Sequence, residues 1–462
     1  MSRSRVWELW RRAETGPLCP EREFDLKRFY PAVKRLVKEY DITYDPETVI
    51  PTDNTLIDDV FKAGIDLLTE VGVLCPDTEK IIQLEEREVK ESLATLSGEM
   101  TVGEGKDACL LKHRKMEDHE PARVFAGPSG NPISEEMAIP IYQSCAQEPT
   151  VDLLMYGTPT TIAGMVSKDG SPMEMYAEVA NVRWLREAAR RAGRPGMFII
   201  GSGAVGVAPA ILASLVENGY RKTDGIQLAG LPQLKIPYFE LCKAEFCIEY
   251  GCRGWVTSPA YIGGLPGGPE AAAVTEVAEC IAANLVFRTP WVCVDIHDLL
   301  YPPGTSRRDV MSMVNLVTAA LAKHTKLIVS TLCDRVYAGC CTDMAFYEFA
   351  VAALGAAVAG GDPMSGCCRE GRYTDYVTGM EGRCTGEIAK SVTGMRRVDA
   401  NDIAKAILAK YEDRLPPKGK PPIGKEFREC YNPKTVTPNK EYVELYGKIK
   451  KELEDMGISY KF

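Results

Sequence analysis

From about residue 150 onward, the chain alternates short apolar runs with longer stretches of helical spacing. The apolar runs are residues 151–157, 197–201, 225–230, 252–258, 291–297 and 326–331, with a weaker candidate at 357–365. The helical stretches are residues 171–193, 205–219, 238–250, 268–287, 307–323 and 343–357. Fully apolar strands that alternate with helices are typical of a parallel sheet covered by helices. Seven or eight such units favour an α/β fold of the (β/α)₈ TIM barrel type over an open sheet.

Two regions flank the predicted barrel, which we expect to occupy residues 126–414. Residues 1–125 predict an N-terminal helical extension that wraps the barrel, and residues 80–96 within it have the pattern of a solvated amphipathic helix. Residues 415–462 begin with a Pro/Lys-rich linker and end in a capped amphipathic helix.

Charge and composition narrow the class of protein. The 462 residues include 64 acidic and 55 basic ones, a formal net charge of −9, so nucleic acid is not expected as a partner. The charged start and the 16 cysteines, interpreted as reduced thiols, predict a cytoplasmic protein. The uncharged stretch 195–216 is long enough to cross a membrane, but its glycines favour a buried strand followed by a helix.

One glycine-rich motif raises an alternative function. Residues 201–206 read GSGAVG and follow a predicted strand, as in a dinucleotide-binding loop. The acidic residue expected after the next strand is missing, because Asp224 precedes that strand. An NAD-dependent oxidoreductase is therefore the weaker hypothesis.

Metal sites are also not favoured. Asp295, His297 and Asp298 end a predicted strand, where they could bind a metal or transfer protons, but four histidines are too few for a multi-histidine site. Six cysteines cluster in the C-terminal half: Cys333, Cys340, Cys341, Cys367, Cys368 and Cys384. None of them forms a C-x₂-C pair, so we predict packed thiols and no bound metal.

In a barrel, catalytic groups gather at the carboxyl ends of the strands. The residues expected there are Tyr156, Ile200, Gln227, Thr257, His297, Cys333 and Arg335. Trp255 shares one side of its strand with Thr257, because side chains in a strand alternate with period two. We interpret these residues as candidates on geometry alone.

The chain resembles the monomethylamine methyltransferase family almost from end to end. The matching segments are IPTD (50–53), FKAG (61–64), GPSGNPISE (127–135), AGRPGM (192–197), CTDM (341–344), TGMEGR (378–383) and FRECYNPKTVTPNKEY (427–442). The resemblance implies a TIM barrel, a homo-oligomer and an enzyme that moves a methyl group from methylamine to a Co(I) corrinoid, as in methanogenesis. The corrinoid would belong to a separate carrier that docks over the barrel mouth, with no cofactor bound permanently. DIHDLL (295–300) resembles the start of the carriers' own D-x-H-x-x-G motif, but Leu300 replaces its glycine.

The sequence departs from the family at its reactive residue. The family has pyrrolysine three residues after RPGM, and this chain has Ile200 there. Pyrrolysine offers an electrophilic imine carbon to the amine, whereas isoleucine is inert. By ungapped alignment, Gln227 and Thr257 replace acids, and Cys333 and Arg335 replace an amide and a tyrosine. A further alternative is that Ile200 stands for pyrrolysine in the natural chain.

These departures shape the functional hypothesis. A quaternary ammonium donor leaves as a neutral amine, so it needs positioning but no covalent capture. Arg335 is predicted to pair with a betaine carboxylate, and His297 to line the substrate pocket. Trp255, Tyr156 and Tyr337 are predicted to face the cation. We predict a corrinoid-dependent methyltransferase for a methylated amine, monomethylamine by family or a quaternary amine. The alternative is an inactive homologue that acts as a binding or assembly subunit.

Overall fold

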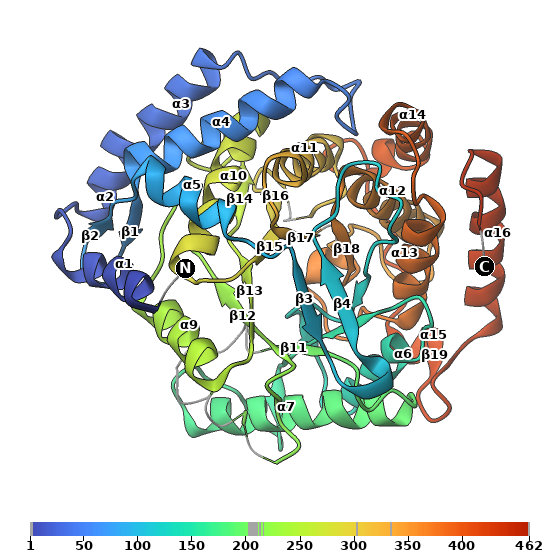
Figure 1. Cartoon of the computed structure of the whole chain (residues 1–462). Helices are drawn as coiled ribbons and strands as arrows, with labels where there is room; N and C mark the ends of the chain where they lie inside the picture. The colour runs from blue at the N-terminus through green and yellow to red at the C-terminus, as the bar shows by residue number, and fades with distance from the viewer. Residues whose placement is uncertain are drawn as a thin grey trace.

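The protein is built around a closed barrel of eight parallel strands, which confirms the predicted TIM barrel (Figure 1). The computed structural model describes residues 3–201, 211, 214–215, 217–301, 304–332 and 335–460. The barrel strands follow one another around the barrel in chain order. They are β5 (Phe125–Ala126), β7 (Leu153–Met155), β11 (Ile199–Gly201), β12 (Gly225–Ala229), β13 (Arg253–Thr257), β15 (Trp291–Val294), β17 (Ile328–Thr331) and β18 (Asp362–Ser365).

Helices cover the outside of the barrel, as the alternating pattern predicts. They are α6 (Ala138–Ala146), α7 (Pro172–Arg191), α9 (Tyr238–Tyr250), α10 (Pro269–Val286), α11 (Arg308–His324), α12 (Asp343–Ala359) and α13 (Gly379–Ser391). The predicted helix at 205–219 lies mostly outside the described residues. The weaker strand candidate at 357–365 divides into the end of α12 and the start of β18.

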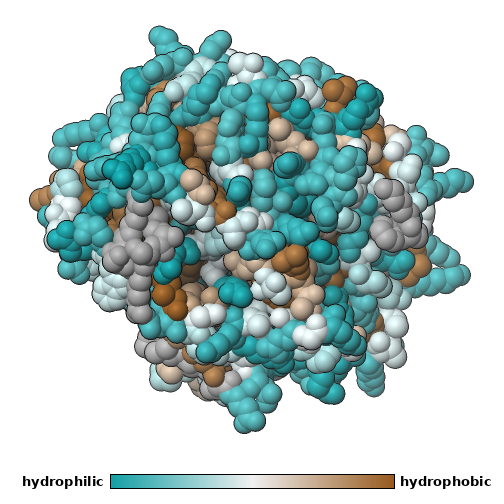
Figure 2. Space-filling view, viewed as in Figure 1, coloured by the Kyte–Doolittle hydropathy of each residue, from teal (hydrophilic) through white to brown (hydrophobic). Residues whose placement is uncertain are grey.

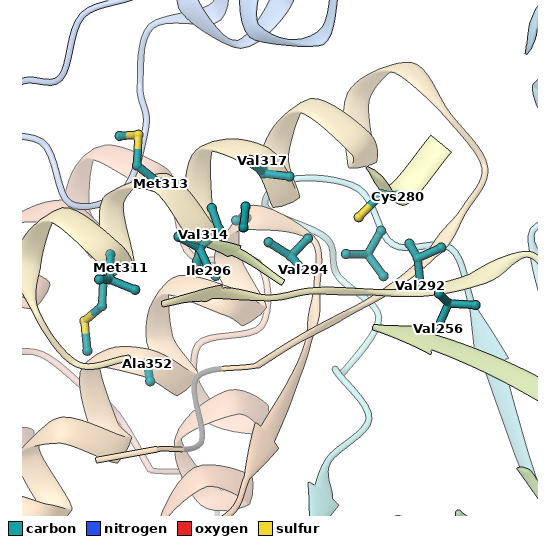
Figure 3. Packing of buried hydrophobic residues seen from close by; sticks show 14 of the residues in the cluster. Val256, Cys280, Val292, Val294, Ile296, Met311, Met313, Val314, Val317 and Ala352 are labelled. Atoms are coloured by element: carbon teal, nitrogen blue, oxygen red, sulfur yellow. The ribbon is translucent and has the colours of Figure 1, made fainter. Parts of the chain in front are cut away.

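The apolar outer faces of the strands pack against these helices. Val256 of β13 and Val292 of β15 are register partners, and both side chains are buried beneath the helix layer. Figure 3 shows them near Cys280 of α10, with Val314 and Val317 of α11 farther along β15. Both faces of these strands are buried. For this reason the strands appear in the sequence as mainly apolar runs.

The inner faces fill the barrel with large side chains. The interior cluster comprises Phe125, Leu153, Met155, Phe198, Ile200, Trp255, Trp291, Cys293, Ile328, Leu332 and Met364. Three residues of a hairpin formed by β3 (Glu99–Val102) and β4 (Cys109–Lys112) join the same cluster, namely Val102, Cys109 and Leu111. The hairpin therefore packs against the barrel interior and leaves the carboxyl ends of the strands as the place for a site.

The N-terminal region combines helices with short hairpins. Its helices are α1 (Arg3–Thr15), α2 (Glu21–Glu23), η1 (Phe24–Phe29), α3 (Tyr30–Glu39), α4 (Asn54–Val71) and α5 (Glu86–Ala94), and its first hairpin is β1 (Val73–Cys75) with β2 (Lys80–Ile82). The prediction of a single helix over residues 80–96 was wrong, because Ile81 and Ile82 pair with Leu74 and Val73 in this hairpin. In Figure 1 this region lies along the side of the barrel covered by α10 and α11, where α4 contacts both helices.

The C-terminal region packs on the neighbouring helix α12 and meets the N-terminal region, where Asn401 accepts hydrogen bonds from Val49 N and Ile50 N. It contains α14 (Arg397–Leu408), α15 (Phe427–Cys430), the hairpin β19 (Tyr431–Asn432) with β20 (Thr437–Pro438), and α16 (Lys440–Asp455). The predicted terminal helix is capped by Asn439, whose side-chain oxygen accepts a hydrogen bond of 2.9 Å from Tyr442 N. The face in Figure 2 is mainly hydrophilic. Among the described helices, none is long and apolar enough to cross a membrane.

Candidate functional site

Polar side chains from three strands meet in a hydrogen-bonded chain at the carboxyl end of the barrel. The Tyr156 hydroxyl donates to Gln227 Oε1 at 2.9 Å, and Gln227 Nε2 donates to Thr257 Oγ1 at 2.9 Å. Tyr156 follows β7, Gln227 lies on β12 and Thr257 ends β13. Only 5% of Tyr156 and of Thr257 is exposed, whereas Gln227 between them is partly exposed. The structure thus brings together three of the predicted site residues.

Ile200 lies directly beside this chain but packs as a core residue. Its carbonyl oxygen accepts a hydrogen bond of 3.2 Å from Tyr156 N, and its side chain is fully buried in the barrel interior. A Cβ on Gly225 would lie 3.1 Å from Ile200 Cγ1 and 2.6 Å from Phe198 Cζ. The glycine therefore makes room for these two side chains. Ile200 contributes packing and offers no reactive group.

Trp255 lies deeper than the polar chain. Its side chain is 2% exposed and belongs to the interior cluster, and its Nε1 donates to Ser330 Oγ at 2.8 Å across β15. Its ring centroid is 6.3 Å from that of Trp291. This aromatic packing occupies the barrel interior beneath the polar chain.

His297 belongs to a second group, on strands that extend the barrel. Here β14 (Ala260–Ile262) pairs in parallel with β16 (Ile296–Asp298), so that Tyr261 is the register partner of His297. His297 Nε2 lies 2.5 Å from Asp295 Oδ1. The centroids of the His297 and Tyr261 rings are 5.9 Å apart. The imidazole is 3% exposed. The pair is therefore a fixed, buried histidine–aspartate arrangement beside the end of β15.

Two buried acids support this second group from helix α10. Glu276 Oε1 accepts a hydrogen bond of 2.6 Å from Asp295 N, and Glu279 Oε1 accepts one from Leu234 N. Burial, with Glu279 and Asp295 nearby, raises the pKa of Glu276 well above its usual range. Sequence reasoning missed both glutamates, although two acids three residues apart in an apolar helix were a detectable signal.

Arg335 lies close to the second group. It forms a parallel bridge with Cys367, and its backbone NH and C=O both bond to Thr305. Burial and the charge of Asp295 raise the pKa of Tyr261 to about 12, and Arg335 opposes this effect. Arg335 thus acts electrostatically on Tyr261, whose ring lies at a tilt to the His297 ring.

Tyr337 lies in a different environment. Its ring packs where a Cβ on Gly304 would be 2.5 Å away, and burial together with the charge of Asp298 raises the pKa of its hydroxyl. The contacts described for it connect it to neither Gln227 nor Trp255. Cys333, the remaining candidate, lies outside the described residues.

A small acidic cavity adjoins the polar chain. Tyr156 forms one wall, and Glu174, Glu178 and Asn181 of α7 form another. The cavity measures about 40 Å³, and both glutamates are largely buried. Carboxylates that surround so small a space favour a compact cation over an anion. Neither glutamate was predicted as a site residue.

The glycine-rich segment does not build a dinucleotide fold. Its Gly201 ends a strand of a closed barrel, not of the open sheet that dinucleotide-binding domains use, and residues 202–206 lie outside the described residues. Asp224 has a structural role, because its side chain forms an ion pair with Arg186. Nothing in the described geometry favours the NAD hypothesis.

Comparison with known proteins identifies the family. The family model described as monomethylamine methyltransferase MtmB matches residues 4–458. The chain belongs to the monomethylamine methyltransferase family. Similar proteins include monomethylamine methyltransferase MtmB of Methanosarcina mazei and MtmB2 of Methanosarcina barkeri. Each is 30% identical over 98% of this chain and 98% of its own length.

Solved structures of the family agree with this one. The Methanosarcina barkeri monomethylamine methyltransferase (MtmB) superposes with a TM-score of 0.93 at 28% identity, over 98% of both chains. A hydroxylamine complex of MtmB gives the same TM-score, identity and coverage. As a member of this family the chain is a methyltransferase, and proteins of the family act with corrinoid proteins.

The structure offers no place for a corrinoid at the DIHDLL segment. His297 there is buried and bonded to Asp295, so it is not presented as an axial ligand to a large cofactor. Leu300, at the position of the carrier motif's glycine, is exposed.

Proposed function

We propose that this chain transfers a methyl group from a methylated ammonium compound, a quaternary amine or betaine, to the corrinoid of a separate carrier protein. The observation that carries the proposal is the place of Ile200. This residue holds the position that the resemblance assigns to pyrrolysine, and its side chain is locked into the barrel core. The donor must therefore react without covalent capture by this residue.

The chemistry of the leaving group supports a quaternary donor. When the methyl carbon is displaced, the carbon–nitrogen electron pair stays on nitrogen, and a quaternary nitrogen departs as a neutral tertiary amine. The corrinoid, when the carrier is bound, supplies the nucleophile. The role of this chain is then to hold the donor in line and to exclude water from its charge.

The residues at the carboxyl end of the barrel suit this role. In our proposal the chain of Tyr156, Gln227 and Thr257 forms a rigid, uncharged floor, because each side chain is fixed by its neighbour. The buried carboxylates of Glu174 and Glu178 give the region beside Tyr156 a negative character that attracts a cation. Arg335 could pair with the carboxylate of a betaine.

The test uses the full chain with a reduced corrinoid carrier and a panel of donors. Glycine betaine, tetramethylammonium, trimethylamine and monomethylamine are supplied in turn, and the demethylated amine is measured by mass spectrometry. We expect product from at least one quaternary donor and none from monomethylamine. Product from monomethylamine alone would refute the proposal and point to an unrecognised capture group. Mass spectrometry of the peptide that contains residue 200 then decides whether pyrrolysine is that group.

Arg335 provides a sharper test of betaine recognition. A hydrogen bond to a charged group is worth about 1.5–3 kcal/mol, so Arg335→Gln should raise the KM for glycine betaine by roughly ten- to hundredfold. The KM for tetramethylammonium, which has no carboxylate, should stay within about twofold. Equal changes for both donors would show that Arg335 acts on structure and not on the carboxylate.

One observation favours a second function. Ile200, at the position that the resemblance assigns to pyrrolysine, is buried and offers no reactive group, so the chain could serve as an inactive binding or assembly subunit. Under that function the carrier would still bind, while no donor in the panel would be demethylated or would raise the melting temperature. The same donor panel therefore distinguishes the two functions.

A further inference from the structure

A cluster of thiols and a carboxylate is buried between the barrel and the C-terminal region, away from the polar chain. The Sγ atoms of Cys340 and Cys368 and a carboxylate oxygen of Glu381 all lie within 4.8 Å of one another. Cys340 lies in the loop between β17 and α12, Cys368 follows β18, and Glu381 lies in the first turn of α13. All three residues are fully buried. Three segments that are distant in sequence thus direct ligand atoms at one point.

The hydrogen bonds of Glu381 orient it for this arrangement. Its Oε2 accepts bonds from Thr378 N at 2.9 Å and Thr378 Oγ1 at 2.6 Å. Its Oε1 faces Cys368 Sγ at 4.0 Å and accepts the hydroxyl of Tyr442 from α16. Carboxylate ligands of metals are held in this way by outer partners that fix their direction.

We propose that Cys340, Cys368 and Glu381 bind a thiophilic divalent cation, with Zn²⁺ as the expected occupant. Tetrahedral zinc with sulfur ligands at about 2.3 Å places neighbouring ligand atoms about 3.8 Å apart. The observed limit of 4.8 Å is therefore within about 1 Å of the geometry that an ion would impose. Two thiolates and one carboxylate are a donor set that zinc accepts.

The C-terminal region contributes a further thiol in the neighbourhood of the three proposed ligands. The Cys430 thiol, at the end of α15, is hydrogen-bonded to Cys341 and close enough to Cys340 and Glu381 for these groups to raise its pKa. Either this thiol or a water molecule completes four ligands. The ion would then connect α15 to the barrel, since the other ligands come from the barrel's own loops.

Binding of the cation exchanges protons for the metal. A cysteine binds a metal as its thiolate, so the thiol proton must leave when the ion binds. Each thiol transfers its proton to solvent as its sulfur electron pair bonds to the cation, and no redox change takes place. The apparent affinity should therefore increase as the pH rises.

The proposed ion would also influence the barrel mouth. Val336 N donates to Cys367 O at 3.1 Å, and Cys367 forms the bridge that holds Arg335. Cys367 is the immediate neighbour of the ligand Cys368. Metal at Cys368 would thus stiffen the backbone that carries Arg335. This inference is independent of the proposed methyl donor.

The test measures metal content and the metal–sulfur bond directly. The full chain is produced with zinc in the medium, freed of loosely bound metal, and analysed by mass spectrometry for metals. We expect about one zinc ion per chain, and a sulfur-to-cobalt charge-transfer band when Co²⁺ is added to the metal-free protein. Cys340→Ser and Cys368→Ser should lose the metal and the band, and Glu381→Gln should weaken zinc binding at least about tenfold. Cys75→Ser, which removes a buried thiol from β1, is the matched control and should keep both.

Two results would overturn the proposal. The first is wild-type protein with less than about 0.1 metal ion per chain and no cobalt–sulfur band. The second is a Cys340–Cys368 disulfide, seen as resistance of both thiols to alkylation until a reductant is added. Because these measurements use the wild-type chain, they decide the question even if the serine variants fail to fold.

Discussion

The hydrogen-bonded chain at the barrel mouth makes a quantitative prediction about Gln227. Replacing Gln227 with Met keeps the size of the side chain but removes the acceptor for Tyr156 and the donor for Thr257. A neutral hydrogen bond contributes about 1 kcal/mol, so Gln227→Met should lower the free energy of unfolding by about 2 kcal/mol. Tyr156→Phe and Thr257→Val each remove one bond, and each should cost about 1 kcal/mol.

The assay is denaturant unfolding of the three variants and of the double variant Tyr156→Phe/Gln227→Met. If Tyr156 and Gln227 are hydrogen-bonded, the double variant costs about 1 kcal/mol less than the sum of its two single variants, because both remove the same bond. Catalysis provides a second measurement, since loss of the floor should lower kcat/KM for the active donor. If the unfolding costs of the two single variants add up to that of the double variant within about 0.3 kcal/mol, Tyr156 and Gln227 do not interact. That result would refute the hydrogen-bonded chain.

Three further predictions concern the interior and the pH dependence. Ile200→Ala should destabilise the fold by about 2–5 kcal/mol and Ile200→Val by only about 0.5–1.5 kcal/mol, as measured by unfolding; equal losses would contradict its core packing. Gly225→Ala should cost about 1–3 kcal/mol, because the new Cβ overlaps Phe198, and unchanged stability would show that the ring moves freely. Burial raises the pKa of Asp362 to about 7, so the folded state binds its proton more tightly than the unfolded state does. Stability that this group contributes at acid pH should be lost as the pH rises from about 4 to about 7, and Asp362→Asn should flatten that part of the profile. An unchanged profile in the variant would assign the dependence to other acids.

Most of the barrel could be predicted because its strands are buried on both faces. Six short, mainly apolar runs correspond to β7, β11, β12, β13, β15 and β17. The first strand, β5, could not be found this way, since it has only two residues, Phe125 and Ala126, before a turn at Gly127 with φ of 138°. Its place in the sheet depends on neighbours that are distant in sequence, Leu153 and Met364.

The site could be predicted in part. Period-two alternation and strand ends located Gln227 and Thr257, and in the structure Gln227 hydrogen-bonds directly to Thr257 and to Tyr156. Acids on the covering helices were missed, because Glu174 and Glu276 look like ordinary helix residues until the packing shows that they are buried. The same reason hid the thiol cluster. Spacing along the chain argued against a metal, whereas the folded chain brings Cys340 and Cys368 together from separate loops.

The exchange at position 200 is compatible with this fold because stability and chemistry reside in different layers of the barrel. The interior layer needs an apolar side chain of suitable volume beside Phe198 and above Gly225, and isoleucine meets that need. The layer above it is polar and held by its own hydrogen bonds, so its composition can change without emptying the core. An isoleucine at the position that the resemblance assigns to pyrrolysine therefore leaves the scaffold folded. In our proposal, what the scaffold can still do depends on the charges around the mouth, which include buried carboxylates and Arg335.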